Sequence, residues 1–189
     1  CFLSLHNSNF LLEGEENLIK RPLKNLILNL EKLGVKFKFA TTPYSLPFQL
    51  KGGNLSCQEL LVDTDKTSQF ASALALISPY VSGGLVLNFK NQIVSKPFFY
   101  MTINMMKECG ARIFCKKNSV VILEGGYKNV YLNIESDWTS ASYIYQLVAF
   151  SQKMTISLSN FFQNSIQGDF NLIYFFNLLG VETIFNGNF

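Results

Sequence analysis

The sequence has few of the residues that metal centres and histidine-dependent nucleophilic sites require. It contains one histidine, His6, in the polar stretch "HNSN". It contains four cysteines without the spacing of metal ligands, and we interpret them as free thiols of a cytosolic protein. They are Cys1, Cys57, Cys109 and Cys115. The sequence therefore predicts no metal site and no catalytic triad.

Charge and long hydrophobic runs are also scarce. Only 15% of residues are charged, against about 25% in an average soluble domain. The net charge of +3 is dispersed, and arginine occurs only at Arg21 and Arg112. The sequence lacks the basic stripe with interleaved aromatics that would indicate nucleic-acid binding. It also lacks an apolar run that approaches the ~20 residues of a membrane span. With 48% hydrophobic residues and 18 Phe, the 189 residues predict a cytoplasmic protein of one large or two small domains with much buried surface.

Three segments share one local pattern, in which a helix-period apolar run ends at a glycine and a short β-type segment follows. The glycines are Gly34, Gly110 and Gly180, and each is predicted to end a helix in the left-handed conformation. The segments are "LILNLEKLGVKFKF" (26–39), "TINMMKECGARIFC" (102–115) and "IYFFNLLGVETIF" (173–185).

A second pair of segments repeats at a similar distance, because "TSQFASALAL" (67–76) and "TSASYIYQLVA" (139–149) both join Thr-Ser to an apolar helix. The chain therefore repeats about every 70 residues, and each full unit is predicted to run strand, helix, strand, helix, strand, strand. This indicates an α/β protein. The predicted helices span 20–33, 67–79, 97–108, 138–150 and 169–179. The predicted strands span 36–40, 47–51, 58–62, 84–89, 111–115, 119–124, 130–134, 153–158 and 181–185.

Several predicted helices begin with polar side chains. Thr67, Ser68 and Gln69 are adjacent at one start, although a single cap needs only one of them. Ser95 precedes another helix, with Lys96 directly after it. A helix start carries free N–H groups and partial positive charge, so it suits phosphate or carboxylate. Ordinary capping and anion binding both remain open at this point.

Three further helix starts carry candidate residues. Arg21 precedes Pro22 at the start predicted near residue 20, and its planar guanidinium suits a carboxylate or phosphate. Asp137 and Gln167 stand before two later helices. An acidic residue in the first turn complements the helix dipole, so we favour that interpretation of Asp137 and of Asp169 over acid/base chemistry.

Five motifs in this order resemble the 5-enolpyruvylshikimate-3-phosphate synthase family, over essentially all 189 residues. They are "KRP" (20–22), "TSQF" (67–70), "VSKPF" (94–98), "SDWTSASY" (136–143) and "SIQGD" (165–169). The resemblance implies the enolpyruvyl transferase fold, an inside-out α/β barrel-like arrangement of βαβαββ units in two domains. Residues 1–134 would belong to the first domain and residues 135–189 would begin the second.

The resemblance also implies the transfer of the enolpyruvyl group of phosphoenolpyruvate to the 5-hydroxyl of shikimate 3-phosphate, without metal or organic cofactor. Thr67, Ser68 and Ser95 would surround the shikimate phosphate, and Gln69 would lie against the shikimate ring. Arg21 would reach phosphoenolpyruvate. The chain departs from the family at Thr67, where Ser is usual, and at Phe98, where Tyr is usual. Weaker substrate-binding candidates are Lys96, Phe98, Asp137 and Gln167.

The same resemblance implies that the chain is an internal piece of a monomeric enzyme, with the proton-transferring carboxylate and further substrate clamps outside it. We therefore expect the 189 residues alone to be inactive. Two other interpretations remain. One is a non-catalytic piece that binds a phosphorylated ligand or packs against a partner. The other is a relative that acts on UDP-N-acetylglucosamine.

Overall fold

A computed structural model describes residues 1–65, 68–151 and 153–186 of the chain. The chain divides into two compact units, Cys1–Val130 and Tyr131–Phe189. Each unit is described by itself.

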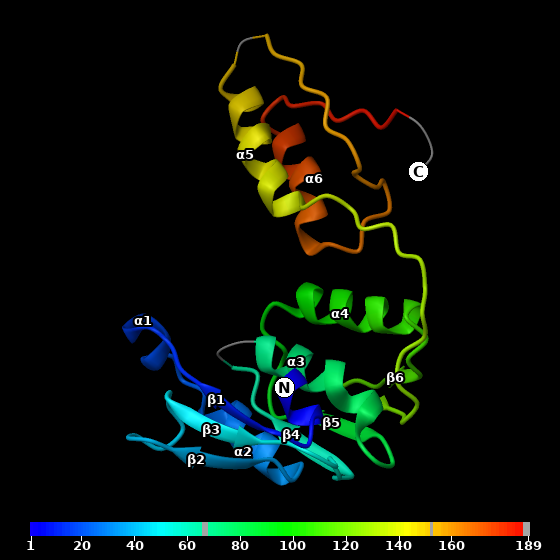
Figure 1. Ribbon diagram of the computed structural model, residues 1–189. Coiled ribbons are helices and arrows are strands. Elements are labelled where there is room, and N and C mark those ends of the chain that lie inside the picture. Colours follow the sequence, from blue (N-terminus) through cyan, green and yellow to red (C-terminus); the bar gives the residue numbers. More distant parts are fainter. Residues whose placement is uncertain (66–67, 152, 187–189) are drawn as a thin grey trace. The chain divides into compact units, whose positions relative to one another are not determined.

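The first unit contains most of the regular structure (Figure 1). Its helices are the 3-10 helices η1 (Phe2–Leu5) and η2 (Ser78–Tyr80) and the α-helices α1 (Glu16–Ile19), α2 (Lys24–Lys32), α3 (Gln69–Ile77) and α4 (Lys96–Glu108). Its strands are β1 (Asn9–Leu12), β2 (Lys36–Phe39), β3 (Phe48–Lys51), β4 (Glu59–Val62), β5 (Leu85–Phe89), β6 (Ile113–Cys115) and β7 (Ser119–Ile122). The second unit contains α5 (Trp138–Ala149), η3 (Gly168–Asn171) and α6 (Leu172–Asn177).

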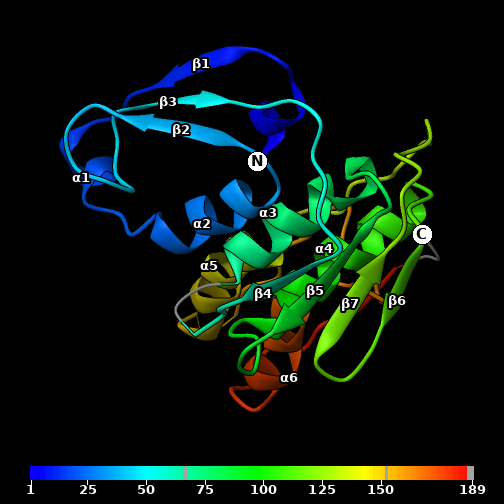
Figure 2. The same cartoon turned by 90° about the horizontal axis from the view of Figure 1, so that it is seen from below.

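The first unit contains the predicted repeat once in full and once in part. Its two sheets have the strand orders β4-β5-β7-β6 and β1-β3-β2 (Figure 2). The elements β4-α3-β5-α4-β6-β7 form the strand, helix, strand, helix, strand, strand unit. The elements β1-α2-β2-β3 repeat its last four members, with the same strand order and the same antiparallel pairings. The repeated α/β architecture predicted from the sequence is therefore confirmed in this unit.

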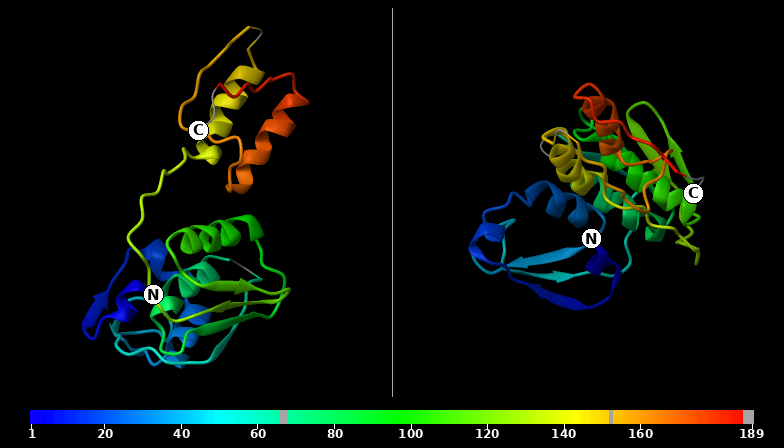
Figure 3. Two further views of the ribbon diagram at one scale, coloured as in Figure 1. Left: turned by 90° about the vertical axis from the view of Figure 1, so that its right-hand side faces the viewer. Right: turned by 90° about the horizontal axis from the view of Figure 1, so that it is seen from above.

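Both sheets and the three long helices of the first unit share one hydrophobic core. The strands show the alternation of a sheet with one buried face, as in β3 and β4, where every second side chain is buried. Helices α3 and α4 lie side by side (Figure 3). The core takes Leu30 from α2, Leu74 from α3, Ile103 from α4, Leu50 from β3 and Leu87 from β5. The second unit has a smaller core around Trp138, Ala141, Tyr145 and Val181.

The three repeat glycines end their helices in the same way. Gly34, Gly110 and Gly180 have φ of +100°, +87° and +83°. In each case the N–H of the residue after the glycine donates to a carbonyl in the last helical turn, as Val35 does to Leu30 at 3.0 Å. The same bond joins Ala111 to Met106 and Val181 to Phe176, each at 3.0 Å. This is the Schellman termination that the sequence pattern predicted.

The strand predictions hold in the first unit but not in the second. Segments 130–134, 153–158 and 181–185 were expected to be strands, and none is one in the structure. A strand exists only when a neighbouring strand completes its hydrogen bonds, and the described part of the second unit contains no strand. The sequence analysis also missed β1, which pairs with β3.

Two kinds of feature are absent from residues 1–65, 68–151 and 153–186. No helix in these ranges is long and apolar enough to cross a membrane. No group of three or more His, Cys, Asp or Glu side chains there is placed to hold a metal ion. All four cysteines are free thiols.

We expect Gly34→Ala to lower the free energy of unfolding by about 1–2 kcal/mol, the cost of a left-handed backbone at a residue with a Cβ. Space is not the cause, because an added Cβ would meet only the Asn54 carbonyl oxygen, at 3.7 Å. Chemical denaturation of the chain measures the change. Gly34→Asn is the matched control, since Asn tolerates this conformation. Equal losses for Ala and Asn would contradict the assignment.

Candidate anion-binding site at two helix starts

The starts of α3 and α4 lie beyond the same edge of one sheet. Strands β4 and β5 are parallel neighbours, and their last residues, Val62 and Phe89, are paired in register. The chain leaves both strands at their carboxyl ends and enters α3 and α4 through short loops. In open α/β sheets this edge is the usual position of ligand sites.

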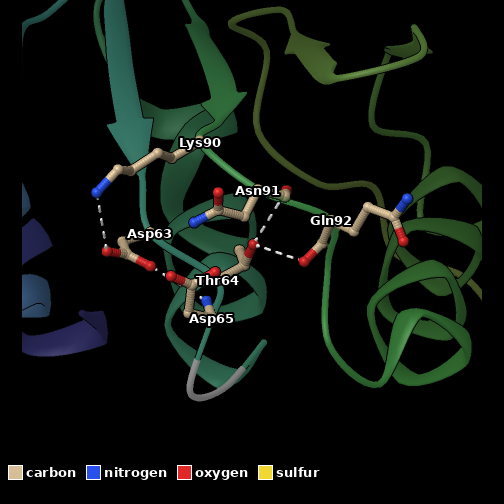
Figure 4. A network of polar contacts seen from close by, with 6 residues as sticks. All are labelled: Asp63, Thr64, Asp65, Lys90, Asn91 and Gln92. Carbon is tan, nitrogen blue, oxygen red and sulfur yellow. Dashed lines mark hydrogen bonds and ion pairs between the residues drawn. The ribbon is translucent and has the colours of Figure 1, made fainter.

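Contacts between the two loops continue beyond the strands (Figure 4). The Lys90 N–H donates to the Val62 carbonyl at 3.1 Å, one step past the paired strands. The Lys90 ammonium lies 3.8 Å from the Asp63 carboxylate. The buried Thr64 hydroxyl then donates to the main-chain carbonyls of Asn91, at 3.4 Å, and Gln92, at 3.3 Å. The loops before α3 and α4 are therefore joined to each other.

The start of α3 holds three of the sequence candidates. Ser68 is the residue before the helix, is 5% exposed, and makes no side-chain hydrogen bond to cap α3. Gln69 is the first residue of α3 and is exposed. Thr67 lies outside the described residues. Capping by the side chain therefore does not apply to Ser68. Its main-chain carbonyl accepts the N–H of Ser72 at 3.0 Å, as the carbonyl of a residue in this position usually does.

The start of α4 has an unusual backbone. Ser95 is exposed and adopts the left-handed conformation, with φ of 54° and ψ of 44°, which costs a residue with a Cβ roughly 1–2 kcal/mol. Its side chain makes no capping bond. Lys96 is the first helical residue, and its ammonium lies 5.5 Å from the centre of the Tyr100 ring. Phe98 is 44% exposed in the first turn.

The charges near this edge are mixed, and the helix starts favour anions. The helix dipoles of α3 and α4 contribute partial positive charge. Free N–H groups add to it mainly at α3, because at α4 Pro97 has no N–H and the Phe98 N–H donates to the Ser95 carbonyl at 3.1 Å. Lys90 and Lys96 contribute whole charges. The carboxylates of Asp63 and Asp65 oppose them, although Asp63 is paired with Lys90. Free N–H groups, a hydroxyl on each side and cationic side chains can together bind an oxyanion such as phosphate.

An enclosed pocket shared by both helix starts stays a prediction. Two cavities lie elsewhere in the chain. One of about 470 Å³ is lined by residues of the second unit that include Lys153 and Thr155. The other, of about 230 Å³, is lined in part by Lys36 and Lys51.

Arg21 does not stand in the first turn of a helix, which corrects the sequence analysis. It lies in the bend between α1 and α2, exposed, and α2 begins only at Lys24 after its N-cap, Leu23. The cause is Pro22, because proline disfavours helical backbone at the residue before it. Within the described residues, the Arg21 guanidinium makes no hydrogen bond or ion pair with protein. It remains available to a ligand.

Asp137 is the N-cap of α5. Its carboxylate accepts the N–H groups of Thr139, at 3.0 Å, and Ser140, at 3.2 Å, and the Ser140 hydroxyl at 2.6 Å. The Ser140 hydroxyl is the main cause that lowers the pKa of this exposed carboxyl, with the two N–H groups adding to it. The dipole and capping interpretation of Asp137 is therefore confirmed. The Asp169 carboxylate accepts the Thr139 hydroxyl.

Gln167 takes part in a network within the second unit. Its Oε1 accepts the Trp138 N–H at 3.0 Å, and its Nε2 donates to the Glu135 carboxylate at 3.1 Å and to the Ser136 carbonyl at 2.8 Å. Glu135 also accepts the Trp138 indole N–H at 2.7 Å and the Ser165 hydroxyl at 2.6 Å. The amide of Gln167 therefore bonds to protein groups at both ends.

Sequence reasoning missed two residues of these networks. Glu135 precedes "SDW" directly, so an acidic residue close to a helix start was visible, but its bonds to Ser165 and Gln167 depend on the tertiary fold. Thr64, inside "DTD", offered no signal beyond a polar residue after a strand.

Solved structures show a fold of the same class. Two structures of EPSP synthase from Acinetobacter baumannii match the chain with TM-scores of 0.68 and 0.61. The match with TM-score 0.68 has 17% sequence identity and covers 86% of this chain and 36% of the solved chain. The match with TM-score 0.61 has 18% identity and covers 76% of this chain and 31% of the solved chain. The chain thus has the inside-out α/β fold of the enolpyruvyl transferases.

The sequence model described as EPSP synthase (3-phosphoshikimate 1-carboxyvinyltransferase) matches residues 1–185, and the chain belongs to that family. A 3-phosphoshikimate 1-carboxyvinyltransferase of Bacteroides fragilis is 33% identical over 171 residues, covering 90% of this chain and 42% of the relative. That of Buchnera aphidicola subsp. Cinara cedri is 30% identical, covering 96% and 42%. That of Methanosphaera stadtmanae is 31% identical, covering 89% and 41%. The chain thus spans about two fifths of these relatives' length.

We expect Asp137→Ala to speed amide hydrogen exchange at Thr139 and Ser140, because their acceptor is removed. Since folding lowers the pKa of Asp137, its stabilisation is fully present above the unfolded pKa of about 3.9 and is lost as pH falls through the lower folded pKa. Protection factors, which remove the intrinsic pH dependence of amide exchange, are measured against pH and check both points. Asp137→Asn keeps an acceptor oxygen without the charge, so it should protect the amides and lose the pH dependence. Persistence of that dependence in Asp137→Asn would contradict the assignment.

Proposed function

We propose that this chain is part of an enzyme that transfers the enolpyruvyl group of phosphoenolpyruvate to the 5-hydroxyl of shikimate 3-phosphate, releasing phosphate. Membership of the EPSP synthase family supports the proposal. The reaction belongs to the shikimate pathway and leads to chorismate and aromatic amino acids.

The observation that carries the proposal is the placement of two uncapped helix starts at one sheet edge. Ser68 and Ser95 precede α3 and α4, and neither side chain caps its helix. The parallel pairing of β4 and β5 brings both starts to the same edge. A phosphate has enough oxygens to accept from both starts, and charge-assisted hydrogen bonds of this kind are the strong ones. We assign Thr67, Ser68 and Ser95 to the phosphate of shikimate 3-phosphate.

The remaining candidates are assigned to the two substrates. We assign Gln69, the first residue of α3, to the shikimate ring and its hydroxyls. Arg21, whose guanidinium is not bonded to any described residue, would hold the carboxylate or phosphate of phosphoenolpyruvate with its planar fork. Lys96 adds positive charge near Ser95. Phe98 supplies an apolar contact, where the family's usual Tyr would also offer a hydroxyl.

The chemistry requires binding and orientation more than a prosthetic group. The 5-hydroxyl loses its proton and its oxygen adds to C2 of phosphoenolpyruvate while C3 gains a proton, which gives a tetrahedral intermediate. Loss of a proton from C3 and of phosphate from C2 then restores the double bond. The residues proposed here would hold the acceptor alcohol close to C2, which makes the step effectively unimolecular.

We propose that the two units are parts of the family's two domains, with the first unit holding later repeats of one domain and the second beginning the other. The division after Val130 supports a boundary in this region. The monomeric state and cytoplasmic location expected from the resemblance stay predictions.

A second candidate function is a non-catalytic piece that binds a phosphorylated ligand. The share of the relatives' length that the chain covers, 42% for the Bacteroides fragilis protein, favours it for the 189 residues taken alone. Both candidates require the same phosphate site and differ in turnover.

We expect Ser68→Ala to weaken binding of shikimate 3-phosphate about ten-fold or more, equivalent to roughly 1.5–3 kcal/mol for a hydrogen bond to a charged group. The free energy of unfolding should change little, because Ser68 makes no capping bond. Amide chemical shifts of the ¹⁵N-labelled chain, followed during titration with shikimate 3-phosphate, measure the affinity, and denaturation measures the stability.

Two comparisons make this test specific. Ser78→Ala removes a buried hydroxyl that bonds to the Leu74 carbonyl at the far end of α3, so it should cost stability and leave affinity unchanged. UDP-N-acetylglucosamine should produce no shifts at Ser68 or Ser95. Shifts with that ligand alone would favour a different enolpyruvyl transferase. Reduced stability with unchanged affinity in Ser68→Ala would show that Ser68 is only structural.

We expect the purified 189-residue chain to form no enolpyruvyl product from shikimate 3-phosphate and phosphoenolpyruvate, although it binds the former. The physical reason is that two substrates with four anionic groups need more cationic side chains than the candidates here supply. Product detection by mass spectrometry decides the matter. Turnover by the pure chain would contradict the prediction and exclude the non-catalytic alternative.

A further inference from the structure

We infer that Thr64 is a positioning residue, whose buried hydroxyl joins the loop before α3 to the loop before α4 and fixes the two helix starts relative to each other. The inference rests on the proposed function, because it concerns how the proposed phosphate site is held.

The first argument is where Thr64 lies relative to the end of the sheet. The last main-chain bond between the two strands runs from the Lys90 N–H to the Val62 carbonyl at 3.1 Å. Beyond that bond, the described residues of the two loops form no further ladder. Thr64 lies just past this point, with its hydroxyl 3.4 Å from the Asn91 carbonyl and 3.3 Å from the Gln92 carbonyl (Figure 4). One hydroxyl hydrogen is shared between two acceptors on the opposite loop.

The second argument is burial. Thr64 is 0% exposed, while Asn91 and Gln92, which supply the acceptor carbonyls, are exposed. A buried hydroxyl that loses its partner pays a desolvation cost, so this bond resists opening. The neighbouring Lys90–Asp63 pair spans 3.8 Å and is partly open to solvent. Exposed pairs of this kind contribute little. Of the two side-chain links, that of Thr64 is the better able to hold the loops.

The third argument is the strained backbone that follows. Gln92 leads into Ser95, which adopts a left-handed conformation although it is not glycine. Such a conformation persists only where the surrounding structure holds it. Thr64 fixes the carbonyls of Asn91 and Gln92, so it restrains the segment that carries Ser95. On its own side, the Asp65 N–H donates to the Asp63 carboxylate at 3.1 Å, which shapes the loop around Thr64.

The consequence is that Thr64 affects ligand affinity without touching the ligand. A phosphate that accepts from both helix starts must find them at one separation, and a loosened pair would have to be ordered on binding. That ordering costs affinity, which preorganisation avoids. Thr64→Val keeps the shape of the side chain and removes the donor. Thr64→Ser keeps the donor and removes the methyl group.

The first measurement is amide hydrogen exchange of the ligand-free chain. Thr64→Val should speed exchange at Lys90 and Phe98, whose N–H groups donate to Val62 and Ser95, by roughly five-fold, the scale of one lost net hydrogen bond. Thr64→Ser should exchange like the unaltered chain. Ser78→Ala is the matched control, because it removes a buried hydroxyl that bonds only within its own helix region. Unchanged exchange in Thr64→Val, or a Val-like response in Thr64→Ser, would overturn the inference.

The second measurement is the titration of the same variants with shikimate 3-phosphate. Thr64→Val should raise the dissociation constant roughly five-fold, while Thr64→Ser and Ser78→Ala leave it unchanged. Binding by the unaltered chain with equal affinity in Thr64→Val overturns the inference and leaves the proposed function standing. If the unaltered chain does not bind shikimate 3-phosphate, the proposed phosphate site is overturned. The positioning role of Thr64 is then overturned as well, even if hydrogen exchange shows that Thr64 joins the two loops. If Thr64→Val does not fold, Thr64→Ser still decides, since faster exchange at Lys90 and Phe98 or a raised dissociation constant relative to the unaltered chain would contradict a hydroxyl-based role.

Discussion

The parallel pairing of β4 with β5 is the constraint on which the candidate site depends. Parallel strands run in one direction, so both chains leave the sheet at the same edge, and a crossover helix must return one chain to the start of the next strand. Val62 and Phe89 are paired at that edge. Both following helices therefore begin there, and the positive ends of their dipoles lie at the same edge. The separation of the two helix starts then rests on the loop contacts, which include the buried Thr64 hydroxyl.

The repeat extends this constraint to a third helix. The order β1-β3-β2 matches β5-β7-β6, so α2 holds the place in its partial unit that α4 holds in the complete one. Arg21 lies in the bend before α2, whose N-cap is Leu23, whereas Ser95 is itself the N-cap of α4. The terminations agree as well, because Gly34 and Gly110 close α2 and α4 with the same hydrogen bonds. Repetition of one unit thus provides several helix starts, and the side chains before them differ in chemistry.

The sequence predicted the elements whose cause is local and failed where the cause is tertiary. Helix ends at Gly34, Gly110 and Gly180 were predictable because a left-handed terminus favours glycine. The strands 130–134, 153–158 and 181–185 were not correct, since apolar pattern alone cannot supply a partner strand. Polar residues such as Ser68 and Ser95 directly before apolar helices indicated the helix starts from sequence alone. The roles of Thr64 and Glu135 could not be predicted, because their bonds form where segments distant in sequence meet. The helix start predicted near Arg21 was wrong although its cause is local, because the effect of Pro22 on the residue before it can be read from the sequence.

The contrast between α5 and α3 bears on the choice between capping and anion binding. At α5 the Asp137 carboxylate takes the two N–H groups of Thr139 and Ser140, so negative charge from the protein itself occupies the helix start. At α3 and α4 the residues before the helix are serines that make no such bond. The helix dipole acts at all three starts, but the free N–H groups differ. At α4, Pro97 has no N–H and the Phe98 N–H donates to the Ser95 carbonyl at 3.1 Å. An oxyanion at α3 would supply what the carboxylate supplies at α5, and at α4 it would interact with the helix dipole and the remaining polar groups.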